Sequence, residues 1–233
     1  MIAAAGWVFE TAISVTARPC AAAAMRARNA VSDAAMGVSV VMDQRLVADA
    51  RAVKRRRRCA HPTLWFFTDF RRLPDPLPVI ARLPPDIAGV VFRHDDDPAR
   101  QTTLRLVFLL CRARRIPLVV AGDAVPTAPA GWHRRRGAGR RMPKPHGWIT
   151  ASAHDGVELR RAVRAGADLI FLSPLFASAS HPGQNGLGAL QWRQLARFSP
   201  VPVLALGGVR GLTLRQLGNF CGGAGAIEAL VTG

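Results

Sequence analysis

The sequence lacks the features that mark membrane proteins, zinc sites and disulfide frameworks. No apolar run reaches the ~18 residues of a membrane-spanning helix. The N-terminus has no early Lys or Arg and carries Glu10, so we expect no secretory signal. The four cysteines, Cys20, Cys59, Cys111 and Cys221, are widely spaced and form no CxxC pair. We therefore expect free thiols, buried at Cys111 and Cys221, and a reducing, cytoplasmic location.

Lysine is nearly absent, although the chain is strongly basic. The net charge is +17, yet the only lysines are Lys54 and Lys144, and the excess comes from arginine. A charge of this size can indicate a nucleic-acid partner. However, aromatic residues are not interleaved with the basic clusters, as a base-stacking surface would need. An Arg- and Ala-rich composition also has a simpler source in residue bias, so we do not expect nucleic acid as a partner.

The sequence divides into two parts of different texture. Residues 1–60 are Ala-rich with weak periodicity and end in the basic run 54–58, which is typical of a solvated segment. We expect them to form a basic N-terminal extension that is poorly ordered or partly helical, with a short helix near Met42–Val53. Residues 61–233 are expected to form the folded domain, because 49% hydrophobic residues allow a sizeable core.

Short apolar runs recur after Pro62, each bounded by turn residues. They are continuous rather than alternating, which is typical of strands buried on both faces of a parallel sheet. The runs cover residues 64–67, 89–92, 117–120, 149–151, 168–172, 202–206 and 225–227, and a weaker one covers 130–133.

Helical patterns fall between several of these runs. Residues 98–114 have apolar positions at helical spacing, and Asp155 can cap a helix that Gly166 ends. Residues 190–198 and 213–220 are further helices. Alternating strands and helices predict an α/β fold, a (β/α)8 TIM barrel.

The predicted barrel is reduced, with short or missing helices. Its domain is shorter than the ~200–250 residues of a typical barrel. Prolines within 73–85 leave room for only a stunted first helix, residues 121–130 leave little room for a third, and 134–145 read as a basic loop. No closing helix follows Glu228, and the N-terminal extension would be one way to cover that gap.

The most specific motifs lie between Gly147 and Gly211. Residues 147–155 read GWITASAHD, 166–170 read GADLI, 173–178 read SPLFAS and 202–209 read PVLALGGV. In order and spacing these segments resemble the thiamine phosphate synthase and thiazole tautomerase superfamily. That family reads GxSxH, a helix, GADYxxxGPxFxTxTK and then PVxAIGG. The resemblance extends weakly back to the first strand and implies the same barrel.

Glycines follow the last two predicted strands. Gly207 and Gly208 come after the seventh strand, and Gly222, Gly223 and Gly225 lie around the eighth. Glycine leaves backbone N–H groups uncovered, so paired glycine loops there favour a nest for a phosphate group. The alternative is that these glycines serve tight turns. We assign Gly207, Gly208 and Gly225 to phosphate binding.

The resemblance also assigns roles to residues at the ends of the fifth and sixth strands. Ser178, Ser180 and His181 stand where the family has threonines and a lysine that contact substrate phosphates. A solvated loop remains an alternative for His181. Ser152 matches a serine that contacts diphosphate, and His154 matches a histidine that serves as acid or base in the tautomerase branch. A structural hydrogen bond at a helix start remains open for His154.

The first half of the chain departs from the family pattern. Of the family's QxRxK at strand two, Arg93 alone is kept, as a diphosphate ligand. The acidic run at residues 94–97 would suit a metal, but it is more simply the first turn of a helix. Asp123 stands where the family has an aspartate that holds Mg2+. The family's HLGQxD appears as residues 133–137 without its carboxylate, which leaves an Mg2+ site with few oxygen ligands. Arginines there would instead clamp a phosphate.

The resemblance implies a transferase that joins a pyrimidine diphosphate to a thiazole phosphate in thiamine biosynthesis. Its partners would be small-molecule phosphate substrates. Because the Mg2+ and diphosphate end is degenerate, two alternatives stay open. One is a tautomerase-like isomerase of a thiazole phosphate, which needs no Mg2+ and uses His154. The other is a non-catalytic barrel that binds a phosphate ligand.

Overall fold

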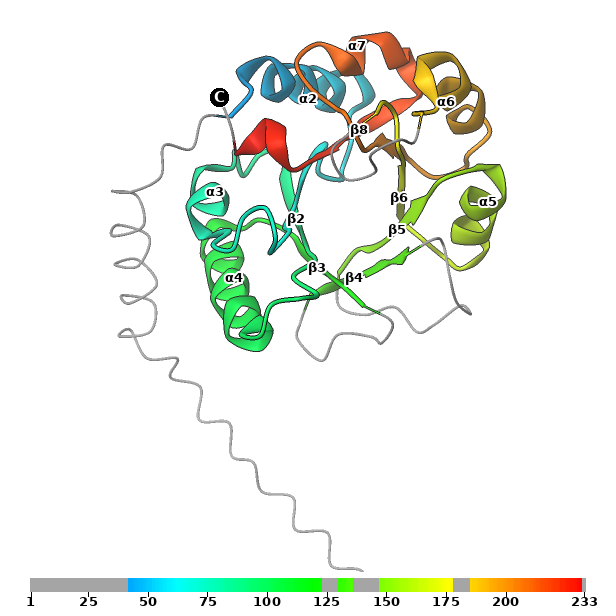
Figure 1. Ribbon diagram of the computed structural model, residues 1–233. Helices are drawn as coiled ribbons and strands as arrows, with labels where there is room; N and C mark the ends of the chain where they lie inside the picture. Colours follow the sequence, from blue (N-terminus) through cyan, green and yellow to red (C-terminus); the bar gives the residue numbers. More distant parts are fainter. Residues whose placement is uncertain (1–41, 123–129, 136–146, 178–184, 232–233) are drawn as a thin grey trace, which may run out of the picture.

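The computed structural model describes residues 42–122, 130–135, 147–177 and 185–231. Its eight strands are parallel and close into a barrel in the order β1 to β8, with helices around the outside (Figure 1). In chain order the elements are α2 (Gln44–Arg57), β1 (Leu64–Phe67), α3 (Leu77–Arg82), β2 (Ala88–Phe92), α4 (Arg100–Arg114), β3 (Leu118–Ala121), β4 (Gly131–Arg134), β5 (Ile149–Ala153), α5 (Gly156–Arg164), β6 (Leu169–Leu172), α6 (Gly188–Ala196), β7 (Val203–Ala205), α7 (Thr213–Leu217), η2 (Gly218–Phe220), β8 (Cys221–Ala226) and η3 (Glu228–Leu230).

This architecture confirms the reduced TIM barrel. Strand β8 returns to β1 with Leu64 opposite Ala224, which closes the sheet. Helix α3 is short, and the described residues place no helix between β3 and β4 or between β4 and β5. None of the helices in the described part of the chain is long and apolar enough to cross a membrane.

Aromatic side chains fill the inside of the barrel. Phe67 and Phe171 meet edge to face with ring centroids 4.8 Å apart, and Trp65 packs on Phe171 at 5.8 Å. Two glycines make room for these rings. A Cβ atom at Gly89 would lie 2.6 Å from the Trp65 ring, and one at Gly225 would lie 2.7 Å from the Phe67 ring. Large and small residues on neighbouring strands therefore complement each other, so the interior is a packed core.

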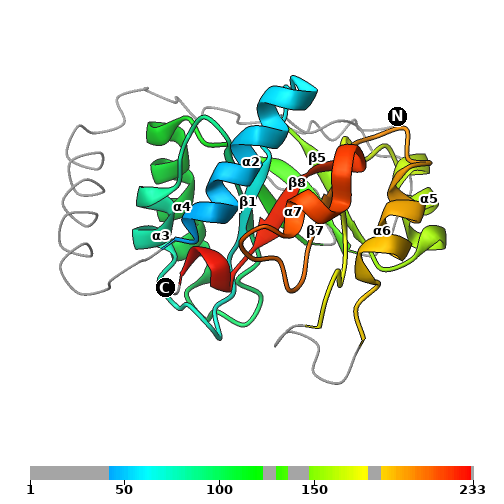
Figure 2. The same ribbon diagram turned by 90° about the horizontal axis from the view of Figure 1, so that it is seen from above.

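Helix α2 lies against the outside of β8, beside α7 (Figure 2). Asp43 caps the helix by accepting from the amides of its first turn, and its Oδ2 accepts from the amide of Gly211 at 2.6 Å. Asp49 Oδ1 accepts from Arg215 Nε at 2.9 Å. The apolar face of α2 belongs to the core between barrel and helices through Leu46, Val47, Ala50 and Val53. We therefore propose that the barrel unit includes α2, so that the boundary between residues 60 and 61 falls after its first helix.

Strand β8 is longer than the sequence indicated. The apolar run at 225–227 predicted a short strand, whereas β8 covers Cys221–Ala226. Gly222 and Gly223 lie in its first half, and a Cβ atom at Gly223 would lie 2.3 Å from the Thr63 carbonyl oxygen. The expectation that Gly222 and Gly223 belong to a phosphate nest is therefore wrong, because they let two backbones approach at the opposite end of the barrel.

The remaining strands lie where the apolar runs predicted them, with ends shifted by one or two residues. Cys111 and Cys221 are free and almost fully buried, as expected. Burial raises the pKa of the Cys111 thiol to about 12 and that of Cys221 to about 11. Both thiols are therefore protonated at neutral pH and act as small apolar side chains.

Candidate active site

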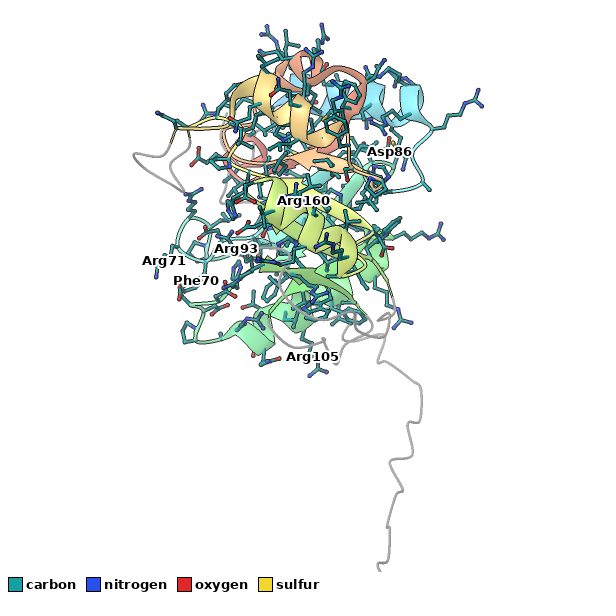
Figure 3. All side chains as sticks on the ribbon, turned by 90° about the vertical axis from the view of Figure 1, so that its right-hand side faces the viewer. Phe70, Arg71, Asp86, Arg93, Arg105 and Arg160 are labelled. Atoms are coloured by element: carbon teal, nitrogen blue, oxygen red, sulfur yellow. The ribbon has the colours of Figure 1, made fainter. Side chains whose placement is uncertain are left out.

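A cavity of about 670 Å³ opens at the end of the barrel where the strands finish. Figure 3 shows Phe70, Arg71 and Arg93 at this end, and Asp86 at the other. Parallel barrels carry their sites at this end because the loops after each strand converge there. The cavity brings together six of the predicted residues, namely Arg93, Ser152, His154, Gly207, Gly208 and Gly225. Asp123, Ser178, Ser180 and His181 lie outside the described residues.

Two glycines after β7 form one wall of the cavity. Gly207 has φ +84° and Gly208 has φ +65°, conformations that side-chain-bearing residues rarely adopt. A Cβ atom at Gly208 would lie 2.8 Å from Phe176 Cβ and 2.9 Å from the Ala177 carbonyl oxygen. Among the described residues, none accepts a hydrogen bond from the amides of Gly207 and Gly208. The wall therefore offers backbone donors beside an uncovered surface.

Ser152 and His154 come from the end of β5. Asp155 caps α5 by accepting from the amides of Val157 and Glu158, as predicted. This places Glu158 beneath the preceding turn, where its Oε2 accepts from the backbone amide of His154 at 2.9 Å and from its Nδ1 at 2.8 Å. A carboxylate that binds Nδ1–H leaves Nε2 as the basic nitrogen of the imidazole. His154 thus has the arrangement of an oriented general base.

His133 lies deeper in the cavity, at the end of β4. Its ring is 2% exposed and packs edge to face on Phe67 at 5.5 Å. Its Nδ1 lies 2.8 Å from Thr150 Oγ1, within hydrogen-bond distance. Burial lowers the pKa of His133 to about 3, and the nearby charges of Arg93 and Arg135 add to this effect. His133 is therefore neutral at physiological pH and presents an uncharged polar group to a ligand.

Four arginines surround the mouth of the cavity, and we call them the arginine rim: Arg72, Arg93, Arg135 and Arg210. They come from the loops after β1, β2, β4 and β7. Carboxylates lie between them, with Arg135 paired to Asp95, and Arg72 and Arg210 both paired to Glu228. This mouth carries more positive than negative side chains, so it favours an anionic ligand.

The described residues do not form a site for Mg2+. No cluster of three His, Cys, Asp or Glu side chains occurs among them, and Asp95 is engaged with an arginine. In the acidic run, Asp97 accepts from the Ala99 amide at 2.7 Å and from Thr103 Oγ1 at 2.7 Å, which confirms the helix-start interpretation. A hard dication needs several oxygen ligands, and the mouth offers carboxylates already held by cations.

Several cavity residues were not predicted from the sequence. Arg72, Arg210 and Glu228 stand outside every motif, and charge alone does not distinguish the two arginines from the chain's many others. His133 was noted as the start of a degraded motif, without a role. A usable signal was present, because alternation along β4 puts His133 inside the barrel while Trp132 points outward.

Comparison with known proteins finds partial matches to thiamine-phosphate synthases. The thiamine monophosphate synthase family model matches residues 135–225. A candidate second thiamine-phosphate synthase of Aquifex aeolicus is 35% identical over 65 residues, 28% of this chain and 35% of that protein. The thiamine-phosphate synthase of Thermosynechococcus vestitus is 28% identical over 126 residues, 50% of this chain and 36% of that protein. The matches thus span about a third of the length of either relative.

Solved structures share the fold. The thiamine phosphate pyrophosphorylase of Pyrococcus furiosus superposes with a TM-score of 0.57 at 22% identity, over 71% of this chain and 85% of that one. FabK of Thermotoga maritima gives a TM-score of 0.50 at 15% identity, over 75% of this chain and 60% of that one. At these identities the likeness concerns the barrel alone.

Proposed function

We propose that this chain is a divergent member of the thiamine phosphate synthase superfamily and that its cavity performs a thiamine phosphate synthase-like transfer. The substrates would be a pyrimidine diphosphate and a thiazole phosphate, both small anionic molecules in keeping with the positive mouth. A cytoplasmic location belongs to the same proposal. The observation that carries it is that one cavity is lined both by the Gly207–Gly208 wall and by Arg93 and Arg135.

The first end is the Gly207–Gly208 wall. Backbone amides beside positive-φ glycines approach an oxyanion closely, because no Cβ atom stands between donor and ligand. Phosphate sites of barrels commonly use the loops after strands seven and eight, which is where this wall lies. We assign the thiazole phosphate to this end.

The second end is the part of the arginine rim after β2 and β4, where Arg93 and Arg135 line the same cavity. The reaction breaks the carbon–oxygen bond between the pyrimidine methylene and its diphosphate, and the electron pair leaves with pyrophosphate. The thiazole nitrogen then forms the new carbon–nitrogen bond. Fixed cations beside the departing oxygens stabilise the charge that develops there. Neutral His133 and the Phe67 ring would enclose the pyrimidine without adding a competing charge.

Turnover of both substrates by the full chain tests this proposal. We expect mass spectrometry to detect thiamine phosphate and an equal amount of pyrophosphate. A folded protein that forms neither would contradict it.

A second candidate is isomerisation of a thiazole phosphate by proton transfer, and the His154–Glu158 pair is the observation that favours it. The carboxylate orients the imidazole at the cavity wall, as acid–base chemistry requires. This reaction uses the glycine wall for the phosphate and has no diphosphate leaving group. Conversion of one thiazole phosphate isomer to another without any pyrimidine substrate would identify it. Binding without either conversion would indicate a non-catalytic barrel.

A further inference from the structure

Two arginines of the rim, Arg72 and Arg93, make only loose ion pairs. Arg93 lies 3.7 Å from Asp69 Oδ2, and Arg72 lies 3.8 Å from the same oxygen and 3.5 Å from Glu228 Oε1. These separations exceed the 2.7–3.2 Å range of N–H···O hydrogen bonds. The carboxylates therefore hold the guanidinium groups in place without consuming their donors.

Arg93 shows this most clearly. Its backbone amide donates to Thr68 Oγ1 at 2.9 Å, which fixes the loop after β2 to the end of β1. Its guanidinium makes no hydrogen bond to any side chain or carbonyl among the described residues, and it lines the cavity. A guanidinium has five N–H donors in a planar fork, which matches two phosphate oxygens at once.

Arg135 lines the same cavity from the loop after β4. It pairs with Asp95 through one terminal nitrogen, NH2. The other donors of its fork are therefore available to a ligand. Arg93, Arg135 and the buried His133 line the same cavity. Burial lowers the pKa of His133, and the positive charges of both arginines add to this effect. Together they carry the charge of one divalent cation.

We propose that Arg93 and Arg135 bind the diphosphate group directly, so that this end of the cavity needs no divalent metal ion. This inference rests on the proposed function and identifies the residues that bind the diphosphate leaving group of that reaction. Arg135 stands in the stretch 133–137, where the family motif HLGQxD appears without its carboxylate. The paired carboxylate Asp95 positions Arg135 and does not serve as a metal ligand.

Calorimetric titration of inorganic pyrophosphate into the full chain tests the inference, first with EDTA and then with Mg2+. We expect binding in EDTA, and an affinity that Mg2+ changes by less than about threefold, well short of the tenfold that 1.4 kcal/mol represents. Pyrophosphate binding that appears only when Mg2+ is added would overturn the inference.

Variants separate the arginines from a general charge effect. Arg93→Ala and Arg135→Ala should each weaken pyrophosphate binding by about tenfold or more, because each removes charge-assisted hydrogen bonds. Arg105→Ala is the matched control, since Arg105 is exposed on α4 and outside the cavity. It should leave the affinity unchanged. An equal loss in all three variants would overturn the assignment.

Asp95→Asn distinguishes the two roles of that carboxylate. Asparagine keeps an oxygen that accepts from Arg135 and so keeps it in position, but it removes the negative charge that competes with the ligand, so pyrophosphate binding should be unchanged or tighter. A loss of binding restricted to Mg2+ buffer would instead mark Asp95 as a metal ligand and contradict the inference. Titration of thiazole phosphate in the same series separates a failure of this inference from a failure of the proposed function. Binding of thiazole phosphate without binding of pyrophosphate would overturn this inference alone. No binding of thiazole phosphate would overturn the proposed function.

Discussion

Glu158 holds His154 through two hydrogen bonds to one carboxylate oxygen, at 2.9 Å from the backbone amide and 2.8 Å from the ring. The arrangement follows from local sequence, because Asp155 starts helix α5 and brings Glu158 back over the residue before the cap. His154 is therefore fixed in both position and tautomer at the cavity wall. An imidazole held in this way is suited to proton transfer.

Replacing His154 by Gln tests its catalytic role. If His154 transfers a proton, we expect the turnover rate to fall about 100-fold or more while thiazole phosphate binding changes little. Glu158→Gln should give a smaller fall in the rate, since the amide keeps a hydrogen bond to His154 but loses the charge. Rates and affinities measured on both variants check this. Unchanged turnover in His154→Gln would assign the pair a structural role.

His133 predicts a specific dependence of stability on pH. Its folded pKa of about 3 lies below the ~6.5 of an unfolded histidine. Between these values the unfolded chain binds a proton that the folded chain does not, so unfolding becomes easier as the pH falls below 6.5. By pH 5 this group should cost on the order of 2 kcal/mol.

The measurement compares urea unfolding of the wild type and His133→Gln at pH 7 and pH 5. Glutamine keeps a hydrogen-bonding partner for Thr150 but does not titrate, and the other titratable groups are common to both proteins. We expect the wild type to lose more free energy of unfolding over this range. Equal losses would show that His133 is not buried as a neutral ring.

Helix α2 should contribute to the stability of the barrel. Leu46 is fully buried in the core between α2 and the strands, so Leu46→Ala should lower the free energy of unfolding by about 2–5 kcal/mol. Arg45→Ala, at an exposed position of the same helix, is the control and should change it little. If the first 60 residues were a separable extension, the two variants would be equally stable.

The fold was predictable because most of its strands are continuous apolar runs in the sequence. Leu64–Phe67 and Leu169–Leu172 face aromatic rings on one side and helices on the other, so both faces select apolar residues. Strand β8 is an exception, because it is not a run of large apolar residues. Its sequence, Cys-Gly-Gly-Ala-Gly-Ala, has small residues because the Phe67 ring and the Thr63 backbone leave no room for larger ones. The segment's own sequence shows no pattern from which this restriction could be predicted.

The site was predictable in part for a similar reason. The strands follow one another around the barrel in the same order as along the chain. Topology therefore brings together the residues at the strand ends, among them Gly207, Gly208, Ser152 and His154. The arginine rim does not follow in this way. Arg135 and Asp95 are 40 residues apart, and their pairing depends on the directions of two loops that local sequence does not encode.

The most direct test of the account is calorimetric titration of thiazole phosphate into the wild type, Gly208→Ala and Gly218→Ala. Both glycines have a positive φ, +65° at Gly208 and +63° at Gly218, so alanine is strained at either position. A Cβ atom at Gly208 would crowd Phe176 and the Ala177 carbonyl oxygen and so displace the wall of the cavity, whereas one at Gly218 has nothing within 4 Å. We expect wild type and Gly218→Ala to bind one equivalent and Gly208→Ala to bind at least about tenfold more weakly. Equal binding by all three proteins, or none by the folded wild type, would contradict a phosphate site at the Gly207–Gly208 wall.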